Sequence, residues 1–349
     1  MIPIQNIYYM LSYAFNVLNE NGYKNIATED FSNGAELCAA ILSKGISVQV
    51  KRGLGREYIE QTEALSSLKG RIGISESIKT RSMLKNQLIC SYDDFSVNSY
   101  MNRIIKTTLD LLLSADISKE RKKAIRKILV FFNDVDSLDI HTINWNIQYN
   151  RNNQTYRMLI SICYLVIKGL LQTNSDGSMR IIDFFDEQRM CRLYERFILK
   201  YYTKEFSHIP GFEASASQIP WNVDDGMMDM LPVMQTDIML TYEEKVLIID
   251  AKYYSHTTQA QFDTHTLHSN NMYQIFTYVK NKEAQLSSEP HEVSGMLLYA
   301  QTDESIQPNN TYQMSGNKIS VRTLDLNCDF AQIATQLNQI VEEHFGVLT

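Results

Sequence analysis

The segment from Thr236 to Tyr254, TDIMLTYEEKVLIIDAKYY, constrains the fold of this 349-residue chain more than any other. Its second half alternates around Asp250 and Lys252, which puts both charged side chains on one face of a period-2 strand. Residues 241–245 favour a turn that folds the two halves back as an antiparallel hairpin. Asp237, 13 positions before Asp250 (250 − 237), then comes close to it. We therefore expect two carboxylates and an ammonium to meet at the end of one apolar hairpin.

This group of side chains suits a hard divalent cation such as Mg²⁺, which takes a few carboxylates, several waters and a substrate phosphate. We expect the carboxylates of Asp237 and Asp250, with the Ala251 carbonyl, to hold the metal. Lys252 would orient or help deprotonate the attacking water and steady developing charge. The chemistry indicated is metal-assisted hydrolysis of a phosphodiester.

The acid-x-Lys triplet alone is weak evidence, because the chain contains it three times, at 120–122, 243–245 and 250–252. Asp250 and Lys252 could simply form a salt bridge at a strand end. Context favours the catalytic interpretation, because only the third triplet ends an apolar strand with an upstream acid in reach. Further candidates are Glu195, at the margin of a predicted helix over 187–205, and the i, i+4 pair Gln274 and Tyr278. Glu195 could complete the second acidic position, whereas Gln274 and Tyr278 could orient the DNA backbone or serve only as core or cap residues.

Other chemistries have weaker support. His256, His265 and His268 invite a zinc hypothesis, but they lack i, i+4 helical spacing and have no cysteine nearby. The five cysteines are scattered without CxxC spacing, which argues against a disulfide framework. The glycine-containing stretch after Lys69 lacks the Lys-Ser/Thr ending of a nucleotide-binding loop, so we do not expect this chain to hydrolyse nucleotides.

The length predicts two domains, which we place at residues 1–150 and 151–349, divided by a polar, turn-rich stretch from about 134 to 153. The C-terminal half alternates helices and strands and predicts an α/β layer architecture. In the N-terminal half the period changes after Gly45, where alternating Ile46, Val48 and Val50 predict a strand. The remaining expected elements are helices at 7–18, 35–43, 98–112, 118–132, 154–171, 270–282 and 330–345, and strands or turns at 87–95, 180–185, 213–221, 295–300 and 318–326.

Two N-terminal segments carry basic residues. Residues 51–74 are rich in glycine and charge and predict strands joined by projecting loops that bear Arg52, Arg56 and Arg71. The predicted helix at 118–132 has a basic face, which is either a solvated surface or a phosphate site. Overall the chain is acidic, with a net charge of −7, so a partner is expected to hold any DNA substrate.

No stretch approaches the roughly 18 uncharged apolar residues that span a bilayer, and the N-terminus lacks the basic region of a signal peptide. We therefore expect no membrane association and a cytoplasmic location.

Three blocks in order resemble the McrC family, the nuclease subunit of the McrBC modified-cytosine restriction system. They are IPIQNIYYMLSYAF near the N-terminus, CSYDDFSVNSYMNRIIKTTL at 90–109, and the sequence TDI…LIIDAKYY…HSNNMYQI in the C-terminal half. By position, Asp237, Asp250 and Lys252 match the acidic pair and lysine of that family. The first motif position here is Thr-Asp rather than Pro-Asp, which leaves the carboxylate intact.

The resemblance implies a PD-(D/E)xK endonuclease domain attached to a mixed α/β N-terminal domain that docks on McrB, an AAA+ ring that binds and hydrolyses GTP. In this interpretation the ring reads modified cytosine and moves double-stranded DNA, while this chain stimulates the GTPase and cuts with Mg²⁺. The segment around Arg52, Arg56 and Arg71 would then be a finger inserted into the partner, or else an ordinary surface hairpin. A second hypothesis is a catalytically degenerate activator of the ring, although the intact Asp237, Asp250 and Lys252 favour the nuclease.

Overall fold

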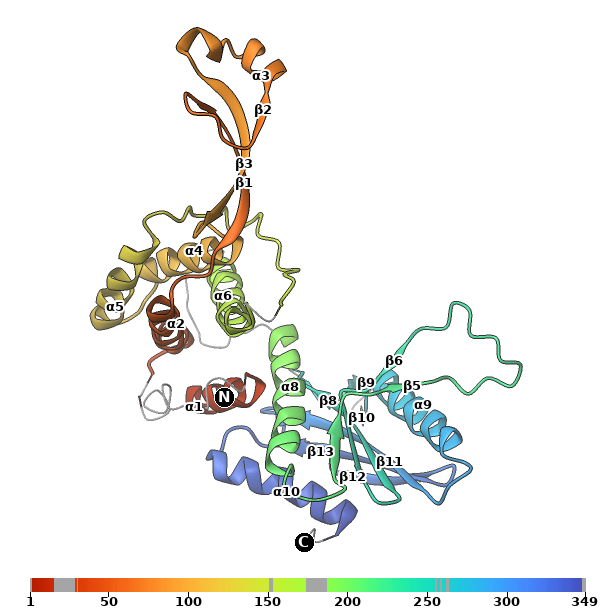
Figure 1. Ribbon diagram of the computed structural model, residues 1–349. Coiled ribbons are helices and arrows are strands. Elements are labelled where there is room, and N and C mark those ends of the chain that lie inside the picture. The colour runs from red at the N-terminus through yellow and green to blue at the C-terminus, as the bar shows by residue number, and fades with distance from the viewer. Residues whose placement is uncertain are drawn as a thin grey trace. The chain divides into compact units, whose positions relative to one another are not determined.

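The structure is a computed structural model that describes residues 2–15, 29, 31–150, 153–173, 187–254, 256–257, 259–261 and 264–346. The chain divides into two compact units (Figure 1). One, here called the sheet unit, comprises Met1–Phe31 and Ile181–Thr349; the other, the helical unit, comprises Ser32–Arg180. Within the described part of the chain, no helix combines the length and apolar character needed to cross a bilayer.

The division differs from the expected boundary at residue 150, and aromatic packing explains why the N-terminal helix belongs to the sheet unit. The ring of Tyr13 lies 5.8 Å from that of Phe197 and 5.4 Å from that of Tyr201, and Tyr9 stacks on Phe330 at 4.4 Å. The units also differ from the expected domains after residue 150, because the helical unit continues to Arg180. Tyr156, which follows residue 150, accepts a hydrogen bond from the Gly55 amide, so its helix packs in the helical unit.

The sheet unit is built on a six-stranded mixed sheet with strand order β12-β13-β11-β8-β7-β4. Strand β8 pairs parallel with β11 and antiparallel with β7, and β11 pairs parallel with β13. Its strands are β4 (Glu213–Ser215), β5 (Gln218–Ile219), β6 (Met234–Gln235), β7 (Ile238–Tyr242), β8 (Lys245–Lys252), β9 (Gln259–Gln261), β10 (Thr264–Thr266), β11 (Glu292–Ala300), β12 (Asn310–Met314) and β13 (Asn317–Leu324). Its described helices are α1 (Ile4–Ala14), α8 (Glu187–Glu205), α9 (Ser269–Gln285) and α10 (Phe330–Phe345).

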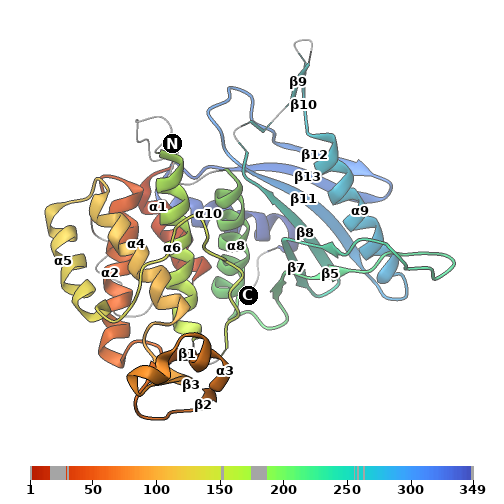
Figure 2. The ribbon, with the colours of Figure 1, turned by 90° about the horizontal axis from the view of Figure 1, so that it is seen from above.

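Helices cover both faces of this sheet: α9 lies on one side, and α8 and α10 lie on the other (Figure 2). Helix α9 comes very close to β11 because Gly295 has no side chain. A Cβ atom there would lie 2.8 Å from side-chain atoms of both Ile275 and Val279. The result is a core of buried, mainly aliphatic side chains between α9 and the central strands. The α/β class expected from the sequence is confirmed.

The helical unit packs α2, α4, α5 and α6 together and extends an arm made of β1, β3 and β2 with two short helices (Figure 1). Strands β1 and β3 pair antiparallel over nine residues each, which corresponds to about 30 Å of extended chain. Gly70 allows the arm to close, because its φ is +67° and a Cβ there would lie 2.4 Å from the Ser91 carbonyl oxygen. The elements are α2 (Gly34–Arg52), β1 (Glu57–Leu65), β2 (Arg71–Gly73), α3 (Ile74–Lys79), η3 (Ser82–Lys85), β3 (Leu88–Ser96), α4 (Tyr100–Ser114), α5 (Lys119–Leu129), η4 (Val130–Phe132) and α6 (Gln154–Thr173).

One predicted strand is wrong. Ile46, Val48 and Val50 lie in α2, which continues through Gly45 and ends only at Gly53, where φ is +93°. The helix begins at an Asn33 cap, and Ser47 Oγ donates to the Ser43 carbonyl inside it. Because helical hydrogen bonding and packing continue along α2, they override the local preference of β-branched residues for strands. The sequence analysis also did not predict the short helices α3 and η3, the strands β6 and β12 or the hairpin β9–β10. The prediction for 180–185 lies outside the described residues.

Candidate active site

The β7–β8 hairpin brings Asp237 and Asp250 together. In an antiparallel ladder the residue numbers of opposed residues have a constant sum. Ile238 pairs with Ile249, which gives 487, and Asp237 and Asp250 give the same sum. They are therefore the next cross-strand pair, with Asp237 immediately before the first residue of β7, and directly opposed side chains lie on one face. The two-residue turn that fixes this register contains Glu243 with φ at 51°. The predicted meeting of the two carboxylates thus follows from the hairpin register.

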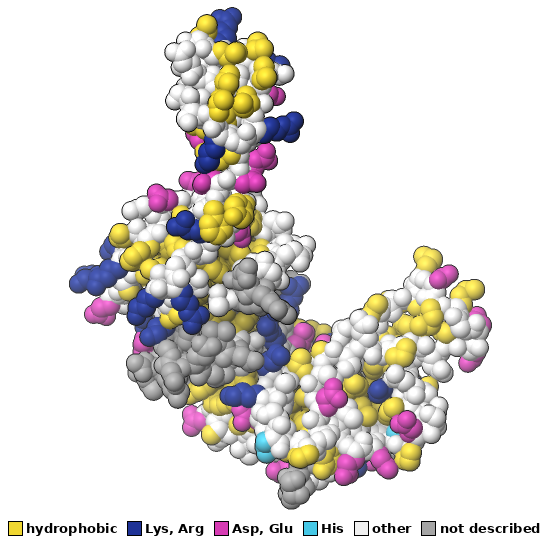
Figure 3. Space-filling model, viewed as in Figure 1, with side chains coloured by type: hydrophobic (Ala, Val, Ile, Leu, Met, Phe, Trp, Pro, Cys, Tyr) yellow, Lys and Arg dark blue, Asp and Glu magenta, His cyan; other side chains and the backbone are white. Residues whose placement is uncertain are grey.

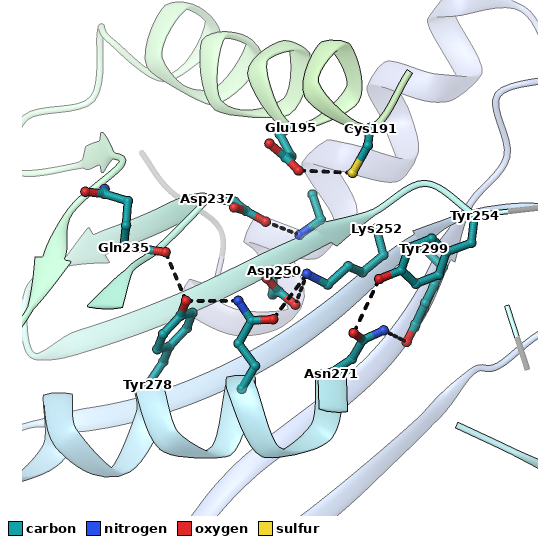
Figure 4. A network of polar contacts seen from close by, with 12 residues as sticks. Cys191, Glu195, Gln235, Asp237, Asp250, Lys252, Tyr254, Asn271, Tyr278 and Tyr299 are labelled. Atoms are coloured by element: carbon teal, nitrogen blue, oxygen red, sulfur yellow. Dashed lines mark hydrogen bonds and ion pairs between the residues drawn. The ribbon is translucent and has the colours of Figure 1, made fainter. Parts of the chain in front are cut away.

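Asp250 is a buried charge next to a lysine. Its exposed fraction is 1%, because it leaves β8 among apolar side chains on the face covered by α9. Lys252 Nζ donates to Asp250 Oδ1 at 2.9 Å and forms an ion pair with Oδ2 at 2.8 Å (Figure 4). Asp237 Oδ2 accepts a hydrogen bond from the Ala251 amide at 3.0 Å. The salt bridge that the sequence offered as an alternative therefore exists, but as part of a buried group with a second acid.

Burial shapes the charges of this group. It raises the pKa of Asp250 to about 7, with the neighbouring Asp237 adding to the rise and Lys252 opposing it. Burial also raises the pKa of Asp237, against the opposing effects of Lys252 and the Ala251 amide. For Lys252, burial lowers the pKa but the charge of Asp250 more than offsets this, so the pKa is raised overall. The lysine is therefore an ammonium, whereas the two acids compete to ionise.

Glu195 approaches the site from α8, on the other side of the strands from α9 (Figure 4). Cys191, one turn earlier on α8, donates to Glu195 Oε1 through its thiol at 3.1 Å. Burial raises the pKa of Glu195, and the charge of Asp237 raises it further. The predicted third acid thus lies close enough to Asp237 to interact with its charge, with its orientation set by Cys191.

Gln274 and Tyr278 of α9 lie on the lysine side of the site. Gln274 Oε1 is 3.4 Å from Lys252 Nζ, and its Nε2 donates to the Tyr278 hydroxyl at 2.9 Å. The Tyr278 hydroxyl in turn donates to the Gln235 carbonyl at 3.0 Å. Because Tyr278 is only 8% exposed, this chain of contacts connects the core to the lysine.

The structure adds to the site one residue and one group of residues that the sequence analysis missed. The sequence analysis did not assign Cys191 to the site, although the i, i+4 spacing from Cys191 to Glu195 on a predicted helix was an available signal. Asn271 Nδ2 donates to the Tyr299 hydroxyl at 2.9 Å, and Asn271 Oδ1 lies 3.4 Å from the Tyr254 hydroxyl. No local pattern pointed to this group, since it joins three separate elements.

The residues present fit a divalent cation. Asp250 Oδ2 is buried and, among the described residues, has no hydrogen-bond donor, although the Lys252 ammonium lies 2.8 Å from it. Mg²⁺ commonly takes one or two carboxylates from a protein and completes its shell with water and phosphate. Within the described ranges no three His, Cys, Asp or Glu side chains form a metal-binding cluster, so the candidate set is two carboxylates and the Ala251 carbonyl.

The histidines have other neighbours. His256 Nδ1 lies 3.6 Å from Glu304 Oε1, and His268 Nε2 lies 3.3 Å from the His256 carbonyl oxygen. The side chain of His265 is outside the described residues.

The three arginines assigned to partner binding are all exposed, but they are not gathered at one point of the arm. Arg52 is the last residue of α2, Arg56 precedes β1, and Arg71 begins β2.

These observations define a class: a mixed α/β protein whose central sheet holds two acids and a lysine at the ends of adjacent strands. Residues 5–300 match the family model described as "McrBC 5-methylcytosine restriction system component". The chain therefore belongs to this family, as a McrC-type subunit, and the resemblance seen in the sequence is confirmed.

A relative from Escherichia coli (strain K12), described as "Type IV methyl-directed restriction enzyme EcoKMcrBC", is 27% identical over 354 residues. The match covers 99% of this chain and 98% of the relative. Two solved structures from Thermococcus gammatolerans are also similar. The first, a half-complex of McrB AAA+ hexamers with bound McrC, has 15% identity and a TM-score of 0.49, covering 97% of this chain and 76% of that one. The second, a McrBC complex, has 17% identity and a TM-score of 0.39 over 58% of this chain and 59% of that one. Both scores are too low to assign a common fold.

Proposed function

We propose that this chain is the Mg²⁺-dependent DNA endonuclease subunit of a GTP-dependent restriction complex directed at modified cytosine. The observation that carries the proposal is the convergence of Asp237, Asp250 and Lys252 at the ends of β7 and β8. We assign the sheet unit to the PD-(D/E)xK nuclease class on the same ground. The E. coli relative, described as a methyl-directed restriction enzyme, supports the choice of substrate.

The carboxylates of Asp237 and Asp250 and the Ala251 carbonyl would hold Mg²⁺. When bound there, the metal supplies Lewis-acid activation of the scissile phosphodiester and of water. The carboxylates contribute by placing negative charge at a fixed, poorly hydrated point, and the Ala251 backbone N–H stabilises that charge by donating a hydrogen bond to Asp237 Oδ2. Glu195 supplies a third acidic position near Asp237.

Lys252 stabilises negative charge that develops on the phosphate. The raised pKa of Lys252 keeps it protonated, and a protonated lysine suits this role better than the removal of a proton from water. Gln274 and Tyr278 act on Lys252, because Gln274 contacts its ammonium and Tyr278 anchors Gln274 to the Gln235 backbone. We assign Gln274 and Tyr278 this role in place of the direct contact with the DNA backbone that the sequence suggested.

The arm of the helical unit is the surface we assign to an AAA+ GTPase partner, which binds the GTP. Its distal helices expose apolar side chains that a folded monomer would normally bury: Ile74 is 62% exposed, Ile78 61% and Leu84 81%. Membership of the McrBC family supports this assignment, because the sequence resemblance to the McrC family implies an AAA+ GTPase partner.

The decisive experiment replaces Asp250 with Ala and measures two activities with the partner present: DNA cleavage and GTP hydrolysis. We expect cleavage to fall by at least about a hundredfold, because a metal-holding carboxylate is lost, while stimulation of GTP hydrolysis is retained. Asp303→Ala, at an exposed acid of the same unit, is the matched control and should leave both activities unchanged. Cleavage by Asp250→Ala at the wild-type rate would show that the assignment is wrong. A wild-type chain that stimulates the GTPase but never cuts would instead identify the degenerate activator.

A further inference from the structure

Helix α5 presents a continuous basic face on an otherwise acidic protein. Helical spacing puts five of its cations on one arc, opposite the buried residues Ile125 and Ile128. Dark blue side chains gather over α5 in the space-filling view (Figure 3). The five are Lys119, Lys122, Lys123, Arg126 and Lys127, all exposed except Lys122, which is half-buried.

These five cations have no carboxylate to pair with among the described residues. The neighbouring Arg121, by contrast, forms an ion pair with Glu36 at 3.4 Å, and Glu36 also accepts hydrogen bonds from the amide and hydroxyl of Ser118. Glu36 therefore fixes the start of α5 on α2. The contacts of Glu36 with Arg121 and Ser118 hold α5 in place and leave the charges of the five cations unpaired among the described residues.

Such a face has a cost in stability. The helix contains three like-charge pairs at i, i+4, namely 119/123, 122/126 and 123/127, each of which destabilises an isolated helix by about 0.2–0.5 kcal/mol. A surface that only needs to be soluble usually mixes both signs of charge. The chain has more acidic than basic residues, with 40 Asp and Glu against 33 Lys and Arg, yet Glu120 is the single acidic residue of α5. The arrangement indicates a polyanionic ligand.

We propose that the basic face of α5 binds the sugar-phosphate backbone of duplex DNA. The choice of DNA rests on the proposed function, and charge complementarity supports the surface itself. From Lys119 to Lys127 the helix rises about 12 Å, which spans roughly three phosphates of one strand. Contacts to phosphates position a duplex without reading its sequence. The helical unit therefore supplies a non-specific hold on DNA that the acidic sheet unit lacks.

The test is the salt dependence of DNA binding by the full chain, measured by fluorescence anisotropy with a short unmodified duplex and with divalent cations chelated. The variant is Lys123→Gln with Lys127→Gln, and the matched control is Lys44→Gln with Lys318→Gln, which removes the same charge from exposed positions of α2 and β13. Each lost phosphate contact makes the slope of log affinity against log salt shallower by about 1. We expect the α5 double variant to lower the slope by about 2 and to weaken binding at least about tenfold at low salt, whereas the control keeps the wild-type slope.

A single variant separates binding from folding. Lys123→Glu replaces two like-charge pairs with two favourable ones, so the thermal stability of the chain should be retained or raised while DNA binding falls. Failure of the wild-type chain to bind the duplex at low salt, or equal slopes for the α5 and control variants, would overturn the proposal. It is also overturned if the α5 variants bind DNA normally but no longer assemble with the AAA+ partner, which would identify a protein contact. Because binding is measured without metal or cleavage, these results are independent of the Asp250→Ala test.

Discussion

Charged groups in the two units of this protein have opposite surroundings. In the sheet unit, Asp250 is 1% exposed and contacts Lys252, and Asp237 is held by the Ala251 amide. In the helical unit, the cations of α5 stand in solvent without a carboxylate partner among the described residues, and the arm exposes apolar side chains such as Leu84. The candidate functional groups are therefore buried in the sheet unit and exposed to solvent in the helical unit.

The difference follows from what each kind of chemistry requires. Charge stabilisation at a reacting bond is strong only where water is excluded and the groups are fixed in advance. Contacts with a partner or with a phosphate backbone need surface area and accessible charge. The comparison predicts that substitutions in the sheet unit change stability and cleavage together, whereas those in the helical unit change binding with little effect on stability.

The largest effect on stability is expected for Asp250→Asn with divalent cations chelated. Burial raises the folded-state pKa of Asp250 to about 7 from an ordinary 3.8, so the folded protein loses stability as pH rises from about 4 to 7. Asparagine cannot ionise and avoids this loss, so the variant should be more stable by about 4 kcal/mol at pH 7 and equal to wild type near pH 4. Urea unfolding at both pH values measures the difference.

Asp303→Asn is the control, since an exposed carboxylate of the same unit should show no such gain. Equal stability of wild type and Asp250→Asn at both pH values would contradict the idea that the sheet unit holds a costly buried charge. In that case the ion pair with Lys252 fully offsets the burial of Asp250.

The core of the site could be predicted from the sequence because it depends on one hairpin. The period-2 pattern of β8 and the turn near Glu243 fix the register, and the register alone opposes Asp237 and Asp250. The surroundings of the site depend on packing between distant elements, which local patterns do not contain. Cys191 is brought to Glu195 within one helix, but Asn271 meets Tyr299 only because α9 packs on β11 through Gly295.

The same reasoning explains the errors in the fold. Local periodicity gave the right type for β3, α4, α8 and α10, where the pattern and the burial agree. It failed at residues 46–50, where three β-branched residues suggested a strand although α2 packs as one continuous helix. The compact units also differ from the expected domains, since only tertiary contacts show that the ring of Tyr13 packs on α8.

A smaller effect is expected at His344, a titratable group of α10 outside the candidate active site. Burial, and then the charges of Lys318 and Lys245, lower the folded-state pKa of His344 to about 4. The unfolded chain takes up this proton near pH 6.5, so the contribution to stability is complete above pH 6.5 and is lost as pH falls toward 4. His344→Gln should remove about 2 kcal/mol of the acid destabilisation, measured as the difference between the two unfolding curves at pH 6.5 and pH 4. Parallel stability profiles of wild type and variant would show that His344 is as accessible to protons in the folded state as in the unfolded one.

The smallest effects on stability are expected for Arg52→Ala, Arg56→Ala and Arg71→Ala in the helical unit. All three side chains are exposed, so each change should alter the free energy of unfolding by no more than about 0.5 kcal/mol. Stimulation of GTP hydrolysis by the partner should nevertheless fall for at least one of them, because the arm and its base are the surface assigned to that partner. Lys44→Ala, at an exposed position of α2, is the control and should leave stimulation unchanged.

Unchanged stimulation in all three arginine variants would rule out these arginines as partner contacts and leave the exposed apolar side chains of α3 and η3 as the part of the arm to be tested. A loss of stability well above the expected limit would contradict the comparison itself, since it would mean that the helical unit also depends on its charges to fold.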